Sequence, residues 1–286
     1  DWAVYIVGCL SLFRQAHEFS WKGLAVLVES SIPQGKGVSS SASLEIAFLQ
    51  ALTKGIPQSF SSLAIPLLGQ RAENQVVGAP CGLMDQLSTY FGRAHQLLPL
   101  VCQPHEVLTP IPIPSSMQFL AIDSGIRHAV SGASYVDVRT AAFMAYSWIA
   151  QNEGVSIADL KSAAESQEFS RLPYRGYLAN IPLVHFQTHL ASHLPEQLKG
   201  EEFLHRDSIS IDPVTAVESQ VTYRLRACAK HPIEENDRIH RFREMLQQWK
   251  EEADSEEKLR QLGAWMYESH AGYSSVGLGN VQTDDL

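Results

Sequence analysis

The sequence predicts an α+β fold, with a mixed N-terminal region and a C-terminal region richer in helix. In the N-terminal region, apolar runs typical of short strands alternate with segments of helical spacing. From about residue 133 onward the pattern is mostly helical. We place the boundary near residues 110–116 and therefore expect two domains, over residues 1–114 and 115–286.

The first elements along the chain are predicted to be a helix, a strand, a loop and a second helix. Residues 1–17 carry apolar side chains at helical spacing, and residues 23–29 form a short, β-rich apolar run. A loop rich in glycine and serine follows over residues 34–41 and leads directly into residues 42–50, which have a helix-forming composition. The order strand, glycine loop, helix is the most informative local feature.

Further along, residues 60–76 are predicted to form a helix. Three short strands are expected, separated by turns rich in proline, over residues 97–101, 106–108 and 117–122. The last long helical stretch runs over residues 236–272 and is rich in Glu, Lys, Gln and Leu.

Composition excludes several classes of protein. With 45% hydrophobic residues the chain is too apolar to be disordered. The excess of 31 acidic over 22 basic residues gives a net charge of −9, which argues against a general nucleic-acid or anionic-membrane surface. We therefore expect a small-molecule partner.

Cysteine usage and hydropathy indicate the cytoplasm. The four cysteines lie far apart without a C-x-x-C pair, which is typical of a reduced protein rather than a disulfide scaffold or zinc module. No apolar run reaches the ~18–20 residues that a membrane helix needs. The apolar start lacks the basic region and cleavage pattern of a secretory signal, so we do not expect one.

The glycine-serine loop has the residues of a phosphate cradle. Gly35 and Gly37 allow a tight turn and a close backbone approach to a ligand. The hydroxyls of Ser39, Ser40 and Ser41 follow at a predicted helix start, where free N–H groups and the helix dipole favour an anion. The loop is not a Walker A motif. A solvated loop with a serine N-cap is the alternative, and Lys36 either adds charge at the phosphates or is solvated.

Two carboxylates, Glu73 and Asp85, flank a turn that contains Gly78, Pro80 and Gly82. One carboxylate holding a divalent cation near phosphates, with the other facing a hydroxyl nucleophile, is the minimum that phosphoryl transfer requires. A structural Asp85 that is hydrogen-bonded to backbone is the competing interpretation.

Taken together, these motifs resemble the GHMP kinases, and within them the galactokinase branch. The matching segments are Ile32–Glu45, Ala72–Asn74 and Pro80–Gln86, followed by Ile122–His128, Ser134-Tyr135 with Arg139, Asp212–Val214 and His231–Asn236. The later segments, and Lys36 in the loop, are more similar to the L-arabinokinase type than to ordinary galactokinases.

The resemblance implies a role for each matching residue. ATP phosphates would bind to the loop residues Gly35, Lys36, Gly37, Val38, Ser39, Ser40 and Ser41. Mg²⁺ would bind Ser41 and Glu73, and Asp85 would be the catalytic residue that accepts or polarises the proton of the anomeric hydroxyl. The sugar would contact Gly82, Asp85, Tyr135 and Arg127.

The resemblance also implies a two-domain fold. It consists of an N-terminal domain similar to ribosomal protein S5 and a ferredoxin-like C-terminal domain, with the site in the cleft between them. Compared with the family, we expect the N-terminal domain to lack its first strands and the C-terminal domain to lack its last glycine-rich segment.

The activity implied is an ATP- and Mg²⁺-dependent sugar 1-kinase, with L-arabinose favoured as substrate and D-galactose a close second. A non-catalytic sugar and ATP sensor is the alternative, and the oligomeric state stays open.

Outside these motifs, a continuous helix would place His185, His189 and His193 on one face. We interpret these histidines as a partly solvated face rather than a metal site, because no carboxylate or cysteine completes the set.

Overall fold

The computed structural model of the chain describes residues 2–17, 23–56, 59–102, 105–126, 133–206, 208–250 and 256–286. These residues form two compact units. The first unit holds the described residues up to Ile113 together with 118–126, and the second holds 114–117 and the described residues from 133 onward. The chain therefore returns to the first unit after the boundary that the sequence suggests at residue 114.

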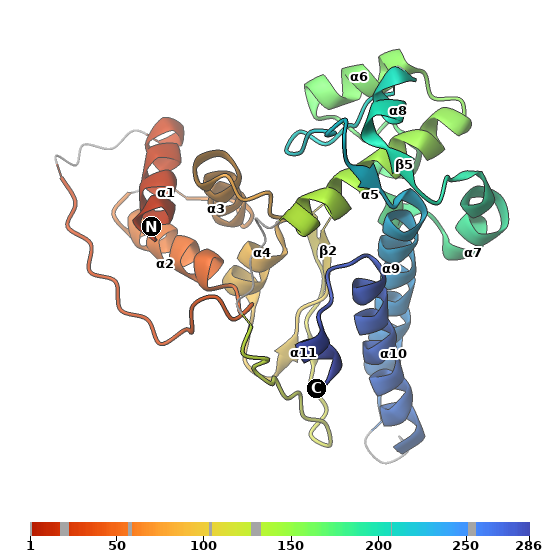
Figure 1. Cartoon of the computed structure of the whole chain (residues 1–286). Helices are drawn as coiled ribbons and strands as arrows, with labels where there is room; N and C mark the ends of the chain where they lie inside the picture. Colours follow the sequence, from red (N-terminus) through yellow and green to blue (C-terminus); the bar gives the residue numbers. More distant parts are fainter. Residues whose placement is uncertain are drawn as a thin grey trace. The chain divides into compact units, whose positions relative to one another are not determined.

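The first unit combines helices with short antiparallel strand pairs (Figure 1). Its elements are α1 (Ala3–Ala16), α2 (Ser40–Lys54), α3 (Ala64–Ala72), the π-helical turn η1 (Glu73–Val77), α4 (Met84–Phe91), β1 (Gln96–Leu97), β2 (Leu100–Cys102), β3 (His105–Val107) and β4 (Ile111–Pro112). Strand β1 pairs with β4 and β2 pairs with β3. The predicted helices at the N-terminus, after the glycine loop and over residues 60–76 are confirmed within a few residues.

The core of the first unit lies where α1, α2 and α3 pack on one another. Each helix contributes the apolar side chains of one face, spaced three or four residues apart, as expected for helices that are half-buried. The fully or nearly fully buried members include Cys9, Phe13, Ile46, Leu49, Leu52 and Ile65.

Two predicted strands of the first unit are wrong. Residues 23–29 and 117–122 belong to no strand, and the side chains of Leu27 and Leu120 are 94% and 86% exposed. Strand propensity alone does not make a strand, because a strand exists only where a neighbour completes its ladder of hydrogen bonds. Within the described residues of the chain, neither run has such a neighbour.

The second unit is predominantly helical (Figure 1). Its elements are α5 (Ala133–Asn152), α6 (Ile157–Ser166), the short 3₁₀ turns η2 (Pro173–Gly176) and η3 (Leu178–Asn180), α7 (Leu183–His185), the π-helical turn η4 (Phe186–Leu190), the 3₁₀ turn η5 (Ala191–His193), β5 (Leu198–Lys199), α8 (Gly200–His205), β6 (Thr222–Tyr223), α9 (Leu225–Gln247), α10 (Glu256–Ser275) and α11 (Val281–Asp284). Strands β5 and β6 pair antiparallel. The prediction of mostly helix beyond residue 133 is confirmed, and so is the α+β class of the chain.

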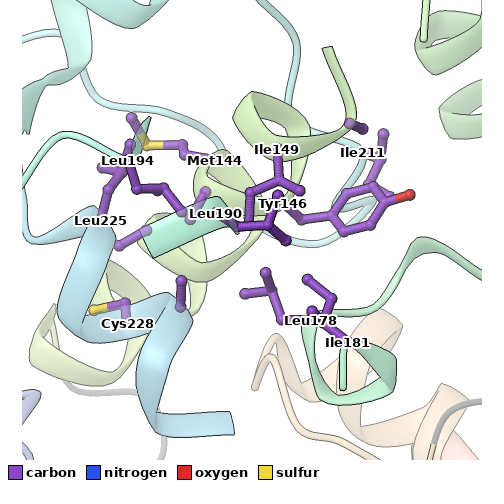
Figure 2. Close-up of a cluster of buried hydrophobic side chains, with 14 of the residues drawn as sticks. Met144, Tyr146, Ile149, Leu178, Ile181, Leu190, Leu194, Ile211, Leu225 and Cys228 are labelled. Carbon is purple, nitrogen blue, oxygen red and sulfur yellow. The ribbon is translucent and has the colours of Figure 1, made fainter. Parts of the chain in front are cut away.

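Helices α5 and α9 supply the centre of the second core, and the turns between them close it. Figure 2 shows Met144, Tyr146 and Ile149 of α5 beside Leu225 and Cys228 of α9. The Tyr146 hydroxyl, the polar atom of an otherwise buried side chain, donates to the carbonyl of Pro173 at 2.7 Å. The second core is therefore largely apolar, and the hydroxyl of its largest buried side chain is satisfied.

A buried ion pair joins two of the matching segments inside the second unit. Arg139 of α5 donates two hydrogen bonds to Asp212, at 2.8 and 2.7 Å. Asp212 also accepts from the backbone of Val214 and from the backbone and hydroxyl of Thr215. The arginine is thus bound side-on, and the carboxylate also fixes the turn that follows it.

No helix among the described residues is long and apolar enough to cross a membrane. All four cysteines are free thiols: Cys9 and Cys228 are buried, Cys81 is half-buried and Cys102 is exposed.

Candidate functional site

The glycine-serine loop turns through left-handed backbone conformations. Gly35 and Gly37 have φ values of 68° and 70°, which glycine adopts without penalty. Ser39 has a φ of 56°, a conformation that costs a non-glycine residue about 1–2 kcal/mol. Strain of this kind concentrates at functional sites.

The N-terminus of α2 has no side-chain cap. Ser39 stands at the capping position, but its side chain accepts no hydrogen bond from the first turn, and that turn contains no acidic residue. The Ser43 hydroxyl instead donates to the Ser39 carbonyl at 2.9 Å. The first N–H groups of a 15-residue helix are therefore open to an anion, which favours the phosphate cradle over the serine N-cap.

A cavity of about 790 Å³ opens beside this helix end, within the first unit. Ser40, Ser41 and Ser43 line it on one side, and Trp2, Val28 and Val77 line it with apolar surface. An apolar wall next to hydroxyls and a helix N-terminus suits a ligand with a flat apolar part and an anionic part. A nucleotide has both parts.

Lys36 of the loop pairs with a carboxylate from a distant part of the chain. Its Nζ lies 2.9 Å from Asp123 Oδ2, and Asp123 also accepts from the backbone N–H of Gly125. The hydrogen bond from Lys36 lowers the pKa of Asp123, and the bond from Gly125 adds to that shift. Both side chains are accessible to solvent, so the pair holds the loop only weakly and Lys36 can exchange Asp123 for a phosphate.

Glu73 is buried at the start of the π-helical turn η1. Its carboxylate accepts a hydrogen bond from the Gln86 amide at 2.8 Å. Burial raises the pKa of Glu73, and the nearby Cys81 and Ser41 side chains oppose that shift. A π-helical turn widens the helix by one residue and frequently lies at a functional site. Glu73 lies near Ser41 of α2, the other residue that we expect to bind a metal.

The donor set of Ser41 and Glu73 fits Mg²⁺. Both ligands are hard oxygen atoms, and the Ser41 side chain lies near enough to Glu73 to lower the pKa of that carboxyl. In the part of the chain that the structure describes, no group of three or more His, Cys, Asp and Glu side chains is arranged to hold a metal. A site with two protein ligands is nonetheless typical of Mg²⁺, which keeps water and binds phosphate oxygens.

Asp85 lies in the first turn of α4 and is half-buried. It is close enough to Glu73 and Glu45 for its charge to raise the pKa of both. Among the described residues no hydrogen bond holds the Asp85 carboxylate, which argues against a structural aspartate. Gly82 is exposed, and a side chain at its position would meet no atom within 4 Å, so the surface beside Asp85 is open.

Sequence reasoning missed two buried polar residues at this site, Glu45 and Gln86. The Gln86 amide nitrogen donates to Glu73 Oε2 at 2.8 Å and to Glu45 Oε2 at 3.1 Å. Burial, followed by the charge of Glu73, raises the pKa of Glu45 to about 8. A signal was present: Glu45 falls on the same helical stripe as the buried Ala42 and Ile46, where a carboxylate is out of place.

The expected sugar residues of the second unit are described only in part. Tyr135 lies half-buried in the first turn of α5, and Arg127 lies outside the described residues. The structure thus brings Ser41, Glu73 and Asp85 together within the first unit and places Tyr135 in the second.

The three histidines lie on one uninterrupted helical run that changes geometry along its length. His185 is on α7, His189 on the π-helical η4 and His193 on the 3₁₀ turn η5. The rings of His185 and His189 stack with centroids 5.0 Å apart, and His193 Nδ1 lies 2.9 Å from the His189 carbonyl. His189 and His193 are exposed and His185 is half-buried, which agrees with a partly solvated face.

Comparison with known proteins points to one family. Residues 4–93 match the family described as the GHMP kinases N terminal domain. The chain is 35% identical over 297 aligned residues to L-arabinokinase from Arabidopsis thaliana, covering 100% of this chain and 28% of that protein. It is 35% identical over 137 residues to galactokinase from Haemophilus influenzae (strain PittEE), covering 47% of this chain and 35% of that protein.

Among solved structures, the crystal structure of Lactococcus lactis galactokinase complexed with galactose matches with a TM-score of 0.68 and 18% sequence identity. The match covers 100% of this chain and 60% of that one, and it shows a shared fold. The matches therefore cover only 28% and 35% of the two curated relatives, and 60% of the solved chain.

Proposed function

We propose, from the match of residues 4–93 to the GHMP kinases N terminal domain, that the protein is an ATP- and Mg²⁺-dependent sugar 1-kinase. Its reaction transfers the γ-phosphoryl group of ATP to the anomeric hydroxyl of a monosaccharide. The observation that carries the proposal is the grouping of Ser41, Glu73 and Asp85 beside an uncapped helix end and a cavity of nucleotide size.

Each residue of the site has a role in this reaction. The backbone N–H groups of the loop from Gly35 to Ser41 bind the phosphates of ATP. Ser41 and Glu73 hold Mg²⁺, and the ion, when bound, neutralises charge on the transferred phosphoryl group. The apolar surface of the cavity around Trp2 binds the adenine base of ATP.

Asp85 acts on the acceptor. An anomeric hydroxyl is a poor nucleophile at neutral pH, so a carboxylate that accepts or polarises its proton is worth about 10²–10⁴-fold in rate. The absence of hydrogen bonds to this carboxylate among the described residues leaves it free for a substrate hydroxyl. Gly82 leaves room for the sugar beside it, and we assign Tyr135 and Arg127 to further sugar contacts.

L-Arabinose is the favoured substrate and D-galactose the second. The match to L-arabinokinase extends over the whole chain, whereas the match to galactokinase covers 47% of it. The two sugars share ring stereochemistry and differ by one hydroxymethyl group. Discrimination between them therefore depends on pocket size at that position and is worth about 1–3 kcal/mol.

The wide spacing of the four cysteines in the sequence, without a C-x-x-C pair, supports the cytoplasm as the compartment of the protein. ATP and free monosaccharides are both found there.

The test is ADP release by the protein with a panel of sugars that includes L-arabinose and D-galactose, followed by phosphorus NMR of the product. An anomeric sugar phosphate is the expected result, and it identifies the substrate in the same experiment. Binding of both ATP and sugar without turnover would replace the kinase with a sugar and ATP sensor.

Tyr135→Phe should weaken sugar binding more than ATP binding, and equal losses would make Tyr135 structural.

A further inference from the structure

Gln86 lies between two buried carboxylates and touches both. It is 0% exposed, as is Glu45, and Glu73 is 4% exposed. One nitrogen, Nε2, donates to Glu73 Oε2 at 2.8 Å and to Glu45 Oε2 at 3.1 Å. The two N–H bonds of that amide are therefore fully used, one on each carboxylate.

The two bonds together fix the orientation of the amide. If Gln86 donated to Glu73 alone, its side chain could rotate and carry that bond with it. The second bond, to Glu45, removes this freedom. Glu45 comes from α2 and Gln86 from α4, so the bond also ties the helix that carries the phosphate loop to the helix that carries Asp85.

The hydrogen-bond network of Glu45, Gln86 and Glu73 leaves two buried acceptor atoms unsatisfied among the described residues, so it is not explained by a structural role alone. Glu45 Oε1 and Gln86 Oε1 are buried and have no hydrogen-bond partner in the described structure. A buried polar atom without a partner costs about 1–3 kcal/mol. An apolar pair at these positions would avoid that cost, so stability alone does not explain the polar residues.

Gly69 supplies the space that the network needs. It lies on α3, and a methyl group at its position would come within 3.3 Å of both Gln86 Cγ and Glu45 Oε2. A contact this short requires the two side chains to shift. Glycine inside a helix is unfavourable by about 1 kcal/mol relative to alanine, so the close approach gives a reason for it.

We propose that Gln86 is a positioning residue that holds the carboxylate of Glu73 in place for Mg²⁺, with Glu45 and Gly69 fixing the position of Gln86. The inference rests on the proposed function in one respect, which is that Glu73 binds the metal. Residues that orient a metal ligand typically change metal affinity by about 10–100-fold when they are replaced. The effect should fall on the metal–nucleotide complex and leave sugar binding unchanged.

The experiment measures binding of Mn²⁺, used in place of Mg²⁺, to the protein saturated with ADP, by electron paramagnetic resonance of the free ion. Gln86→Met keeps the length of the side chain and removes both donors, so Mn²⁺ affinity should fall about 10-fold or more. Sugar binding by calorimetry should stay within about twofold. Unchanged Mn²⁺ affinity in Gln86→Met would overturn the proposal.

Two variants of Glu45 show whether its effect on Mn²⁺ affinity comes from its hydrogen-bond acceptor or from its charge. Glu45→Gln retains a carbonyl oxygen for the Gln86 amide and should bind Mn²⁺ as the parent protein does. Glu45→Leu has no acceptor and should lose affinity to the same extent as Gln86→Met. Equal losses in both Glu45 variants would assign the effect to charge and overturn the positioning role.

A glycine pair provides a test that changes no polar group, should Gln86→Met fail to fold. Gly69→Ala crowds the network and should lower Mn²⁺ affinity several-fold. The matched control is Gly263→Ala on α10, where an added methyl group meets nothing within 4 Å and affinity should not change. Thermal unfolding of all variants identifies any that are not folded, and equal affinities in the two alanine variants would count against the proposal.

The two proposals fail in different ways. If the parent protein binds Mn²⁺–ADP but phosphorylates no sugar, the kinase assignment fails, and the variants still decide the role of Gln86. If the parent protein binds no Mn²⁺ in the presence of ADP, both are overturned.

Discussion

The two units each contain a buried charged network, and the two networks are built in opposite ways. In the second unit, Arg139 and Asp212 are of opposite charge, and the carboxylate is further satisfied by Val214 and Thr215. In the first unit, two carboxylates of like charge share one amide, and acceptor atoms of the network have no partner within the described structure.

The difference separates a structural role from a functional one. A buried pair that satisfies all of its polar atoms holds its own fold together and needs nothing more. Like charges kept close together, with acceptors left over, are unfavourable until a cation or a proton joins them. The first unit therefore holds carboxyl groups that a cation or a proton would stabilise, whereas the Arg139–Asp212 pair of the second unit is satisfied by its own neighbours.

The largest expected effect is on turnover. Asp85→Asn should lower kcat by about 10²–10⁴-fold because the acceptor hydroxyl loses its base, while ATP binding and the unfolding temperature stay unchanged. Steady-state ADP release and calorimetry measure the two properties. Asp237→Asn on α9 is the matched control, and it should turn over normally. Full activity in Asp85→Asn would remove this residue from the mechanism.

The next largest effect is on the free energy of unfolding, and it comes from the Arg139–Asp212 ion pair of the second unit. Asp212→Ala leaves the Arg139 guanidinium buried without its partner and should lower the free energy of unfolding by about 3–5 kcal/mol, measured by urea unfolding. The double variant Arg139→Met with Asp212→Leu should recover much of that loss, because an apolar pair replaces the charges. A double variant as unstable as the single one would show that the pair is not an independent unit.

The pH dependence of stability should reveal the carboxylate pair of the first unit. The folded pKa of Glu45, about 8, lies above its ordinary value of 4.5, so the folded protein binds the extra proton. Metal-free protein should therefore lose stability as the pH rises from about 4.5 to about 8, and the contribution should be full below that range. Glu45→Gln should flatten this part of the profile, and an identical profile in the variant would refute the assignment.

The smallest expected effect concerns the apolar runs that form no strand. Leu27 is 94% exposed, so Leu27→Ser should change the free energy of unfolding by no more than about 0.5 kcal/mol. Leu49 is 0% exposed in the core of the same unit, and Leu49→Ala should cost about 2–5 kcal/mol. A loss of more than 1 kcal/mol in Leu27→Ser would show that this run is covered in solution.

The helices and the motif residues could be predicted from the sequence because their signals are local. Helical spacing located α1, α2 and α3, and the loop and its carboxylates stand in short, recognisable segments. Residues 23–29 and 117–122 were misjudged because a strand depends on a partner elsewhere in the chain. Glu45 and Gln86 were missed for a related reason, since their significance arises only when α2, the turn after α3 and α4 come together.

The π-helical turn at Glu73–Val77 affects how the first unit responds to a change in chain length. The N–H groups of Gly78 and Ala79 both close on the Glu73 carbonyl, so the turn absorbs one residue more than an α-helical turn would. Removing any one residue between Glu73 and Gly78 would let the helix continue in ordinary α geometry, at little cost in hydrogen bonds. The residues that follow would keep their helical phase, because the wide turn is where the extra residue is accommodated. The turn is thus the place in the first unit where the chain can change in length by one residue with the least effect on the elements around it.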